Sequence, residues 1–454
     1  MPRAAPPLTV ASLALLVALC AGPASASQTV TKVDGEIRAL AFSGDALVVA
    51  RVPPGRGLVL ERVVPGSPTQ AILTTAFDDE DDEVALAASP QAVALGLKPD
   101  VTDGLGPGSV MVGPPGGPLR EVATCTTGVI ASPVAVAGAR VAWREGGCGE
   151  PQSTPSTVTP SAIAVGGVAA GTPVRKTPVN GLPVALLLAA GDTGIAGVWH
   201  PSFFGIDSEL LPFSPAGLGA AITTERTRAL LPVGILADGT RVGVLGSVDG
   251  DDQCETREVF TIAPGATARR PVPLGGCPVA ERAPGPQTSG GPLAAGDRIL
   301  ALVGTGEDAV TLVSMRGDGG DRRKLVSGTY RRPSGFAADG DRVAWWHPHC
   351  TGGGEIVVQQ GPEPRVRLTS CRAEIVTHRA RARAGKVALR LRCPDGCTGA
   401  ITGRLATPRE FSFDPGTHVV RVPVSLGRSR SARVHLDVFV AHGPIRSATV
   451  TVRR

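Results

Sequence analysis

Short apolar segments that alternate with tight turns recur along most of the chain. Each copy has a few small or apolar residues, a turn, and a second apolar segment, as in ALAFSGDALVVA (39–50) and PVGILADGTRVGVLG (232–246). The turns of seven such copies are centred on Gly44, Pro90, Gly138, Gly191, Gly239, Gly296 and Gly340. Successive turns lie 44 to 57 residues apart. Glycine supplies the positive φ that a short hairpin requires, and the flanking segments are typical of buried strands, so the pattern predicts a repeat of β-hairpins.

Two more strand-like segments follow most copies. After the last turn they are EIVVQQ (355–360) and RVRLTSC (365–371). Four strands in a unit of this length are typical of a β-propeller blade, so the sequence predicts an all-β fold with about seven four-stranded blades. The fourth unit is the least regular, because residues 201–231 contain no clear strand pair. The segment QTVTKV (28–33) is expected to pair with the last blade and close the ring, since closure removes exposed strand edges.

The best-formed copies, FAADGDRVAWW (336–346) and ILADGTRVGVL (235–245), also carry an Asp-Gly pair at the turn. This signature resembles the TolB-type propeller repeat. The resemblance covers about residues 36–371 and implies that a strand, an Asp-Gly turn and a second apolar strand open each blade. The second copy departs from the pattern, because Pro90 stands where the others have glycine.

The last part of the chain alternates with a period of two. In KVALRLRC (386–393) and RVHLDVFV (433–440), apolar residues occupy every second position and charged or polar residues most of the others. This pattern is typical of antiparallel strands with one buried face. About seven such segments predict a small immunoglobulin-like β-sandwich over residues 372–454, after a propeller over residues 27–371.

The predicted sandwich is strongly basic. Residues 372–454 contain 16 Lys and Arg against 5 Asp and Glu, a net charge of +11, whereas the remainder carries 29 against 35, a net charge of −6. The unit is similar to the Arg-rich β-sandwich tails of exported proteins from GC-rich actinobacteria. Arginines at outward strand positions are predicted to contact an anionic cell-wall polymer or lipid, and they are Arg390, Arg392, Arg421 and Arg433. The alternative is that these arginines are solvated and keep the unit soluble.

The N-terminal 26 residues have the features of a secretory signal peptide. Arg3 precedes an apolar segment from Leu8 to Ala21, and Ala24-Ser25-Ala26 is typical of a cleavage site. The sequence therefore predicts an exported protein that is secreted or associated with the cell envelope. No later segment reaches the length of a membrane span, and we expect a monomer.

Eight cysteines remain after residue 26, an even number that favours disulfide bonds in an oxidising compartment. The predicted pairs are Cys125–Cys148, Cys254–Cys277, Cys350–Cys371 and Cys393–Cys397. In the first three pairs, one cysteine is expected after the second strand of a blade and the other at the end of a fourth strand. Both then lie on the face opposite the recurring turns, here called the top face. A zinc site is the alternative, but it requires short CxxC spacings or Cys/His clusters.

The candidate ligand residues of the propeller are Trp199, His200, Trp346, His347 and His349. They follow the second strands of the fourth and seventh units, and we expect them to line a metal or ligand site at the mouth of the central channel. The alternative is that the tryptophans only pack between blades. Clustered carboxylates over residues 78–83, and at Asp249, Asp251, Asp252 and Glu255, are candidate calcium ligands or solvated loops. We expect no other cofactor.

Motifs of known enzyme classes are absent from the sequence. It has no GxSxG, HExxH, Walker or dinucleotide-binding glycine motif, and only 15 aromatic residues. These observations favour a binding or interaction protein, in which a disulfide-linked propeller is the platform and the basic unit contacts an anionic surface or protein. The alternative is an extracellular propeller hydrolase with an active site on the top face. A nucleic-acid partner is not expected, because export and the lack of interleaved aromatics argue against it.

Overall fold

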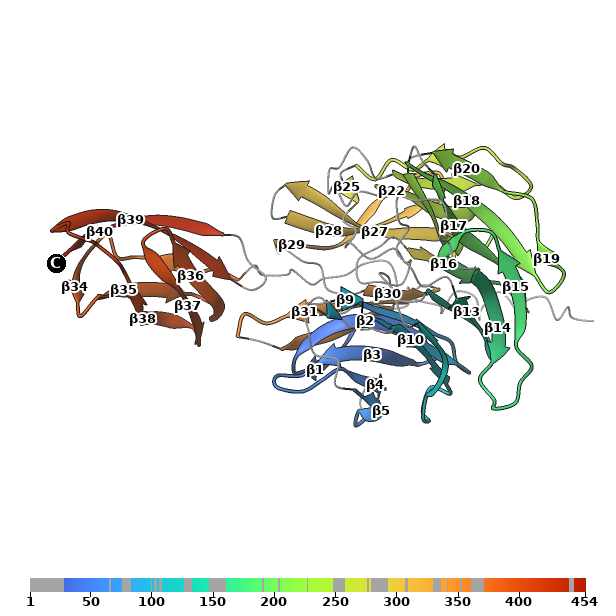
Figure 1. Cartoon of the computed structure of the whole chain (residues 1–454), viewed down its shortest axis with the longest axis horizontal. Helices are drawn as coiled ribbons and strands as arrows, with labels where there is room; N and C mark the ends of the chain where they lie inside the picture. The colour runs from blue at the N-terminus through green and yellow to red at the C-terminus, as the bar shows by residue number, and fades with distance from the viewer. Residues whose placement is uncertain are drawn as a thin grey trace, which may run out of the picture.

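The protein is all-β in the residues that the structure describes. The computed structural model describes residues 28–64, 67–75, 83–98, 100–101, 104–105, 108–125, 133–146, 161–189, 192–202, 205–226, 228–247, 258–275, 277–278, 293–306, 309–329, 336–340, 342–351, 353–360, 371–440 and 445–454. Within these ranges we find strands and turns, and no helix long and apolar enough to cross a membrane. Figure 1 shows a seven-bladed β-propeller with a curled sheet region, the C-terminal unit, to one side of it.

The first three blades each contain four antiparallel strands in chain order from the centre outwards. Blade 1 consists of β2 (Glu36–Ser43), β3 (Ala46–Val52), β4 (Val59–Val63) and β5 (Gln70–Thr74). Blade 2 consists of β6 (Glu83–Ala88), β7 (Val93–Lys98), β10 (Gly108–Gly113) and β11 (Arg120–Cys125). Between β7 and β10 is a small hairpin of β8 (Asp100–Val101) and β9 (Gly104–Leu105). Blade 3 consists of β12 (Val134–Ala137), β13 (Arg140–Gly146), β14 (Ser161–Gly167) and β15 (Arg175–Val179).

Blades 4 and 6 each add a short fifth strand, whereas blade 5 keeps four. Blade 4 consists of β16 (Leu182–Leu188), β17 (Gly194–Ser202), β18 (Gly205–Ser214), β19 (Gly217–Leu218) and β20 (Thr223–Arg226). Its irregular segment thus forms one long strand, β18, whose outer edge is shared by β19 and β20. Blade 5 consists of β21 (Arg228–Ile235), β22 (Arg241–Ser247), β23 (Glu258–Ile262) and β24 (Arg270–Pro271). Blade 6 consists of β25 (Cys277–Pro278), β26 (Leu293–Ala295), β27 (Arg298–Gly306), β28 (Ala309–Arg316) and β29 (Arg323–Thr329).

One strand assignment made from the sequence is wrong. Cys277 was expected to end the fourth strand of blade 5, but that strand is β24, which ends at Pro271. Cys277 instead lies in β25 and pairs with Gly304 of β27. The chain therefore enters blade 6 several residues earlier than the repeat pattern indicates.

Blade 7 closes the ring with a strand from the N-terminal end. It consists of β30 (Phe336–Asp339), β31 (Arg342–Pro348), β32 (Gly354–Gln360) and, outermost, β1 (Gln28–Val33). β1 is antiparallel to β32, and its register runs from Gln28 opposite Gln359 to Val33 opposite Gly354. The predicted closure by residues 28–33 is confirmed. Cys371 does not end a strand of this blade, and residues 361–370 lie outside the described ranges.

The hairpin turns between the first and second strands contact one another around the ring. Five of them contain a glycine with φ between 57° and 84°, namely Gly44, Gly138, Gly239, Gly296 and Gly340. The Ala237 N–H donates a hydrogen bond to the Gly296 carbonyl at 2.7 Å, which joins blades 5 and 6. Arg342 Nη2 donates to the Gly44 carbonyl at 2.9 Å and joins blade 7 to blade 1. The closing blade is therefore fixed to its neighbour on the turn face.

Large apolar side chains fill the space between neighbouring blades. They include all four tryptophans, which are 2 to 7% exposed: Trp143, Trp199, Trp345 and Trp346. Trp346 packs with Ile356 of its own blade and Leu40 of blade 1, whereas Trp345 packs with Leu302 of blade 6. The adjacent tryptophans of β31 thus fill the two interfaces on either side of blade 7.

The C-terminal unit is a curled sheet that folds over its own core. Its strands are β33 (Glu374–Ile375), β34 (Arg379–Arg383), β35 (Lys386–Cys393), β36 (Cys397–Gly403), β37 (Ala406–Phe413), β38 (Gly416–Pro423), β39 (Ser431–Val440) and β40 (Arg446–Arg453). β35 pairs with β38, β33 and β34, and β34 continues to β40, β39, β36 and β37. Alternate residues of β35 and β39, including Leu391 and Leu436, are buried in one shared cluster between the two layers.

Two of the four predicted disulfide bonds are present in the described residues. Cys350–Cys371 links the turn between β31 and β32 of blade 7 to the start of the C-terminal unit, and Cys393–Cys397 spans the turn from β35 to β36. Both Cys350 and Cys371 are buried in the core of the C-terminal unit. Cys148 and Cys254 lie outside the described residues, so the pairs Cys125–Cys148 and Cys254–Cys277 stay predictions.

Candidate functional site

The histidine predicted in blade 4 has a carboxylate partner in its own blade. His200 lies near the end of β17, and its Nε2 is 3.3 Å from Oε2 of Glu209 on the neighbouring strand β18. Trp199 is buried against Leu182 and Ala229, at the interface with blade 5. His200 and Trp199 therefore point to different environments, one polar and one apolar.

The two histidines of blade 7 form a second polar group. The rings of His347 and His349 are perpendicular with centroids 6.1 Å apart, and His349 Nε2 is 3.5 Å from Oε1 of Glu355. In register, Glu355 lies opposite His347 on one side and opposite Lys32 of β1 on the other. Burial, and secondarily the neighbouring His349, hold the pKa of His347 below its usual value of 6.5, while Glu355 acts in the opposite direction.

The predicted ligand residues thus lie in two separate groups. Figure 1 shows β17 and β31, which carry them, on opposite sides of the propeller. Among the described residues there is no group of three or more His, Cys, Asp or Glu that could hold a metal ion. The acidic segments proposed as calcium ligands, residues 78–83 and 249–255, lie outside the described side chains. A site shared by His200 and His347 stays a prediction.

Three of the four predicted surface arginines lie together on one face of the C-terminal unit. Arg390 and Arg392 of β35 and Arg421 of β38 point outwards from the same sheet layer, together with Lys386. We call these four residues the basic face. In register, Val419 of β38 lies opposite Arg390, and it is 58% exposed. The face therefore combines clustered positive charge with an exposed apolar residue at its centre.

Among the described residues, one carboxylate forms an ion pair with this face. Glu374 lies opposite Arg392 in register, and its Oε2 is 3.4 Å from Arg392 Nη2. This ion pair offsets the charge of Arg392, so among the described residues Lys386, Arg390 and Arg421 carry the uncompensated positive charge of the face.

Arg433, the fourth predicted arginine, lies on the opposite layer. It alternates along β39 with buried Val434 and Leu436, and it lies opposite Thr451 of β40. Thr451 in turn pairs with Arg379 of β34, so Arg379 and Arg433 flank it on the outer surface. The alternation of polar and apolar residues in the sequence correctly indicates which side chains point outwards. It does not indicate to which of the two layers of the C-terminal unit a strand belongs, since the strands of both layers alternate in the same way.

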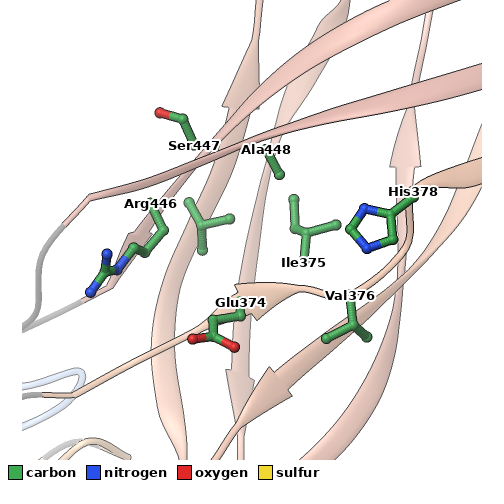
Figure 2. Close-up of a pocket in the computed structure, with 8 residues that line it drawn as sticks. Glu374, Ile375, Val376, His378, Arg446, Ser447 and Ala448 are labelled. Carbon is green, nitrogen blue, oxygen red and sulfur yellow. The ribbon is translucent and has the colours of Figure 1, made fainter.

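A pocket of about 340 Å³ opens where the chain passes from one layer to the other. Its floor is apolar and consists of Ile375, Val438 and Ala448. Figure 2 shows Ile375 in the middle of the pocket, with Glu374 and Arg446 on one side and His378 on the other. The volume is at the lower end of the range typical of small-ligand sites, and a few polar groups surround an apolar floor as in such sites.

The pocket residues were not among the candidates drawn from the sequence. The sequence does contain a signal for the pocket in the alternation of inward and outward residues. The inward residues have odd numbers at first (Ala373, Ile375) and even numbers afterwards (Ala380, Ala382). Such a change of phase marks the place where a strand leaves one layer and joins the other. Glu374, Val376 and His378 line the pocket at this crossing.

Comparisons with known proteins bear on the fold. No family model and no curated protein matches the chain. Among solved structures, one from a study of two prolyl endopeptidases is 14% identical with a TM-score of 0.48, and the match covers 80% of this chain and 54% of that chain. A puromycin hydrolase is 13% identical with a TM-score of 0.43, covering 79% and 58%. The propeller domain of the Trilobed protease from Pyrococcus furiosus is 9% identical with a TM-score of 0.46, covering 73% and 95%.

The chain spans little more than half the length of the prolyl endopeptidase and the puromycin hydrolase. At such low identity these similarities concern the β-propeller fold, which the chain shares with peptidases.

Proposed function

We propose that this protein is a secreted or cell-envelope binding protein whose basic C-terminal unit attaches it to an anionic surface. The observation that carries the proposal is the basic face, where Lys386, Arg390, Arg392 and Arg421 share one outer surface with the exposed Val419. Arginine meets phosphate and carboxylate groups with two parallel hydrogen bonds, and each cation near an anionic surface contributes about 1 kcal/mol. Val419 adds an apolar contact of the kind that a lipid headgroup region or a polymer backbone accepts.

The proposal includes the domain organisation expected from the sequence. Residues 1–26 are a signal peptide, residues 27–371 a propeller of the TolB type, and residues 372–454 an immunoglobulin-like sandwich. The strand order supports the immunoglobulin-like assignment. In one layer β39 lies between β36 and β40, and in the other β35 lies between β33 and β38. Immunoglobulin folds place strands C, F and G, and strands A, B and E, beside one another in the same way.

The propeller is the proposed interaction platform. Its ring is closed by β1, and the C-terminal unit is joined to it through Cys350–Cys371, so a partner held on the propeller stays close to the attachment surface. The alternative drawn from the sequence, an extracellular hydrolase, stays a prediction.

The test is co-sedimentation of the full chain with anionic material at two salt concentrations. Phosphatidylcholine vesicles with and without phosphatidylglycerol form one arm, and a purified anionic cell-wall polymer forms the other. The variant R390Q/R392Q/R421Q should bind about a hundredfold more weakly at low salt, since three contacts of about 1 kcal/mol are lost. Binding of the unchanged protein should weaken as the Debye length falls from about 30 Å at 0.01 M to about 8 Å at 0.15 M salt.

A matched control separates the basic face from total charge. The variant R379Q/R433Q/R453Q removes the same number of charges from the opposite layer. We expect it to bind within about threefold of the unchanged protein, because those side chains face away from the surface. Equal losses in the two triple variants would show that only net charge matters, and no binding in either arm would refute the attachment role.

A further inference from the structure

The pocket of the C-terminal unit lies beside a strand edge that is only half paired. β40 runs from Arg446 to Arg453 and pairs with β39 along its full length. On its other side it pairs with β34 only from Thr451 onward. Before that point the described residues place no strand against β40, and the pocket occupies this side.

The free half of this edge has a definite hydrogen-bonding pattern. The Thr451 N–H donates to the His378 carbonyl at 3.0 Å, so Thr451 turns its backbone groups away from β39. Because these groups alternate along a strand, Thr449 and Ser447 turn theirs to the same side. Within the described part of the chain, Ser447 lines the pocket, and Thr449 follows it along the same side of the strand.

The rim of the pocket favours a negative charge. The Glu374 carboxylate is paired with Arg392 at 3.4 Å, which leaves its charge largely compensated. Arg446, at the start of β40, has no ion-pair partner among the described residues, and its side chain lies at the pocket in Figure 2. An arginine in this position is suited to bind a carboxylate with two hydrogen bonds.

We propose that the edge of β40 binds the C-terminal end of an extended peptide. The ligand strand lies antiparallel to β40, with its backbone paired to Thr449 and Ser447. Its terminal carboxylate meets Arg446, and its last aliphatic side chain enters the pocket over Ile375, Val438 and Ala448. The mode combines strand addition at an exposed sheet edge with recognition of the chain end. The site does not depend on the proposed attachment role, and it meets the basic face at the Glu374–Arg392 ion pair.

The probe is a Thr-Val-Thr-Val peptide with an N-terminal fluorophore, used as the free acid and as the C-terminal amide against the full chain. We expect saturable binding of the acid by fluorescence anisotropy, at least about tenfold tighter than that of the amide, because the amide cannot form the charged pair. In R446Q this preference for the acid should disappear. Amide hydrogen exchange at Ser447 and Thr449 should slow when the acid peptide binds.

Two further variants keep the result interpretable. In S447P the strand loses the N–H that faces the ligand and the Ser447 Oγ hydrogen bond to Asp437, while the backbone pairing with β39 uses other residues, so peptide binding should be lost and the fold retained. The basic-face variant K386Q/R390Q/R421Q, which keeps the Arg392 partner of Glu374, should bind the peptide as tightly as the unchanged protein, and R446Q should sediment with anionic vesicles as before. The proposal is overturned if acid and amide bind alike, if the acid shows no saturable binding up to about 1 mM, or if R446Q keeps the preference for the acid.

Discussion

The buried ion pair of blade 1 gives a sharp test of how the ring is held closed. Arg51 of β3 donates from Nε and Nη2 to the two carboxylate oxygens of Glu61 on β4, both at 2.7 Å. Its Nη1 donates to the Asp34 carbonyl at 2.7 Å, in the link between β1 and β2. Glu61 is 6% exposed, so Arg51 supplies the countercharge of a buried carboxylate and also fixes the connection to the closing strand.

Replacing Arg51 by Met should destabilise the propeller by about 3–5 kcal/mol, the usual cost of leaving one charge of a buried pair without its partner. The double variant R51M/E61M removes both charges and fills a similar volume. It should recover most of this loss, because a buried ion pair and an apolar pair of the same size are often close in stability. Hydrogen bonding to Glu61 raises the pKa of Arg51, so Arg51 stays charged throughout the pH range of the assay.

Tryptophan fluorescence reports this change in the propeller alone. All four tryptophans of the chain lie between residues 143 and 346, and none lies in the C-terminal unit. Urea unfolding followed by this signal gives the midpoint and slope for the unchanged protein, the single variant and the double variant. Hydrogen exchange of residues 29–33 should accelerate in R51M, because the link at Asp34 is released.

Two results would refute the reasoning. A loss below about 1 kcal/mol in R51M would mean that water reaches the carboxylate and that the pair acts as a surface salt bridge. An equal loss in the single and double variants would mean that Arg51 acts through packing of its aliphatic part.

The remaining predictions concern the junction and the histidines of blade 7. Removing Cys350–Cys371 as C350A/C371A should lower the stability of the C-terminal unit by about 3 kcal/mol in the chain-entropy model, and unchanged hydrogen-exchange protection in β35 and β39 would contradict this. Native His347 resists protonation because its pKa is lowered from 6.5, so its contribution to stability is present above that pH and decreases as the pH falls below it. The urea midpoint should therefore fall less between pH 7 and pH 5 in H347Q than in the unchanged protein, and identical falls would show that His347 does not contribute to the pH dependence.

The repeat and the blade architecture were determined by the sequence alone, because they depend on local features. A hairpin turn needs a residue with positive φ, and the structure places Gly44, Gly138, Gly239, Gly296 and Gly340 in that region. The apolar segments beside each turn form strands wherever the structure describes them, since a strand must bury its apolar side chains between neighbouring blades. The closing strand was also predictable, because an unpaired edge on the last blade is unfavourable.

Only the tertiary structure decided which distant segments lie together. The alternation of β35 and β39 indicates which side chains point outwards, but Arg390 and Arg433 lie on opposite layers. In the same way, Cys277 belongs to blade 6 rather than blade 5. The pocket at Arg446 requires the chain to change layers between Ile375 and Arg379, and its depth and charge arise from residues about 70 positions apart. The local alternation of polar and apolar residues contains no information about such contacts, because they are fixed by the packing of whole layers against a shared core.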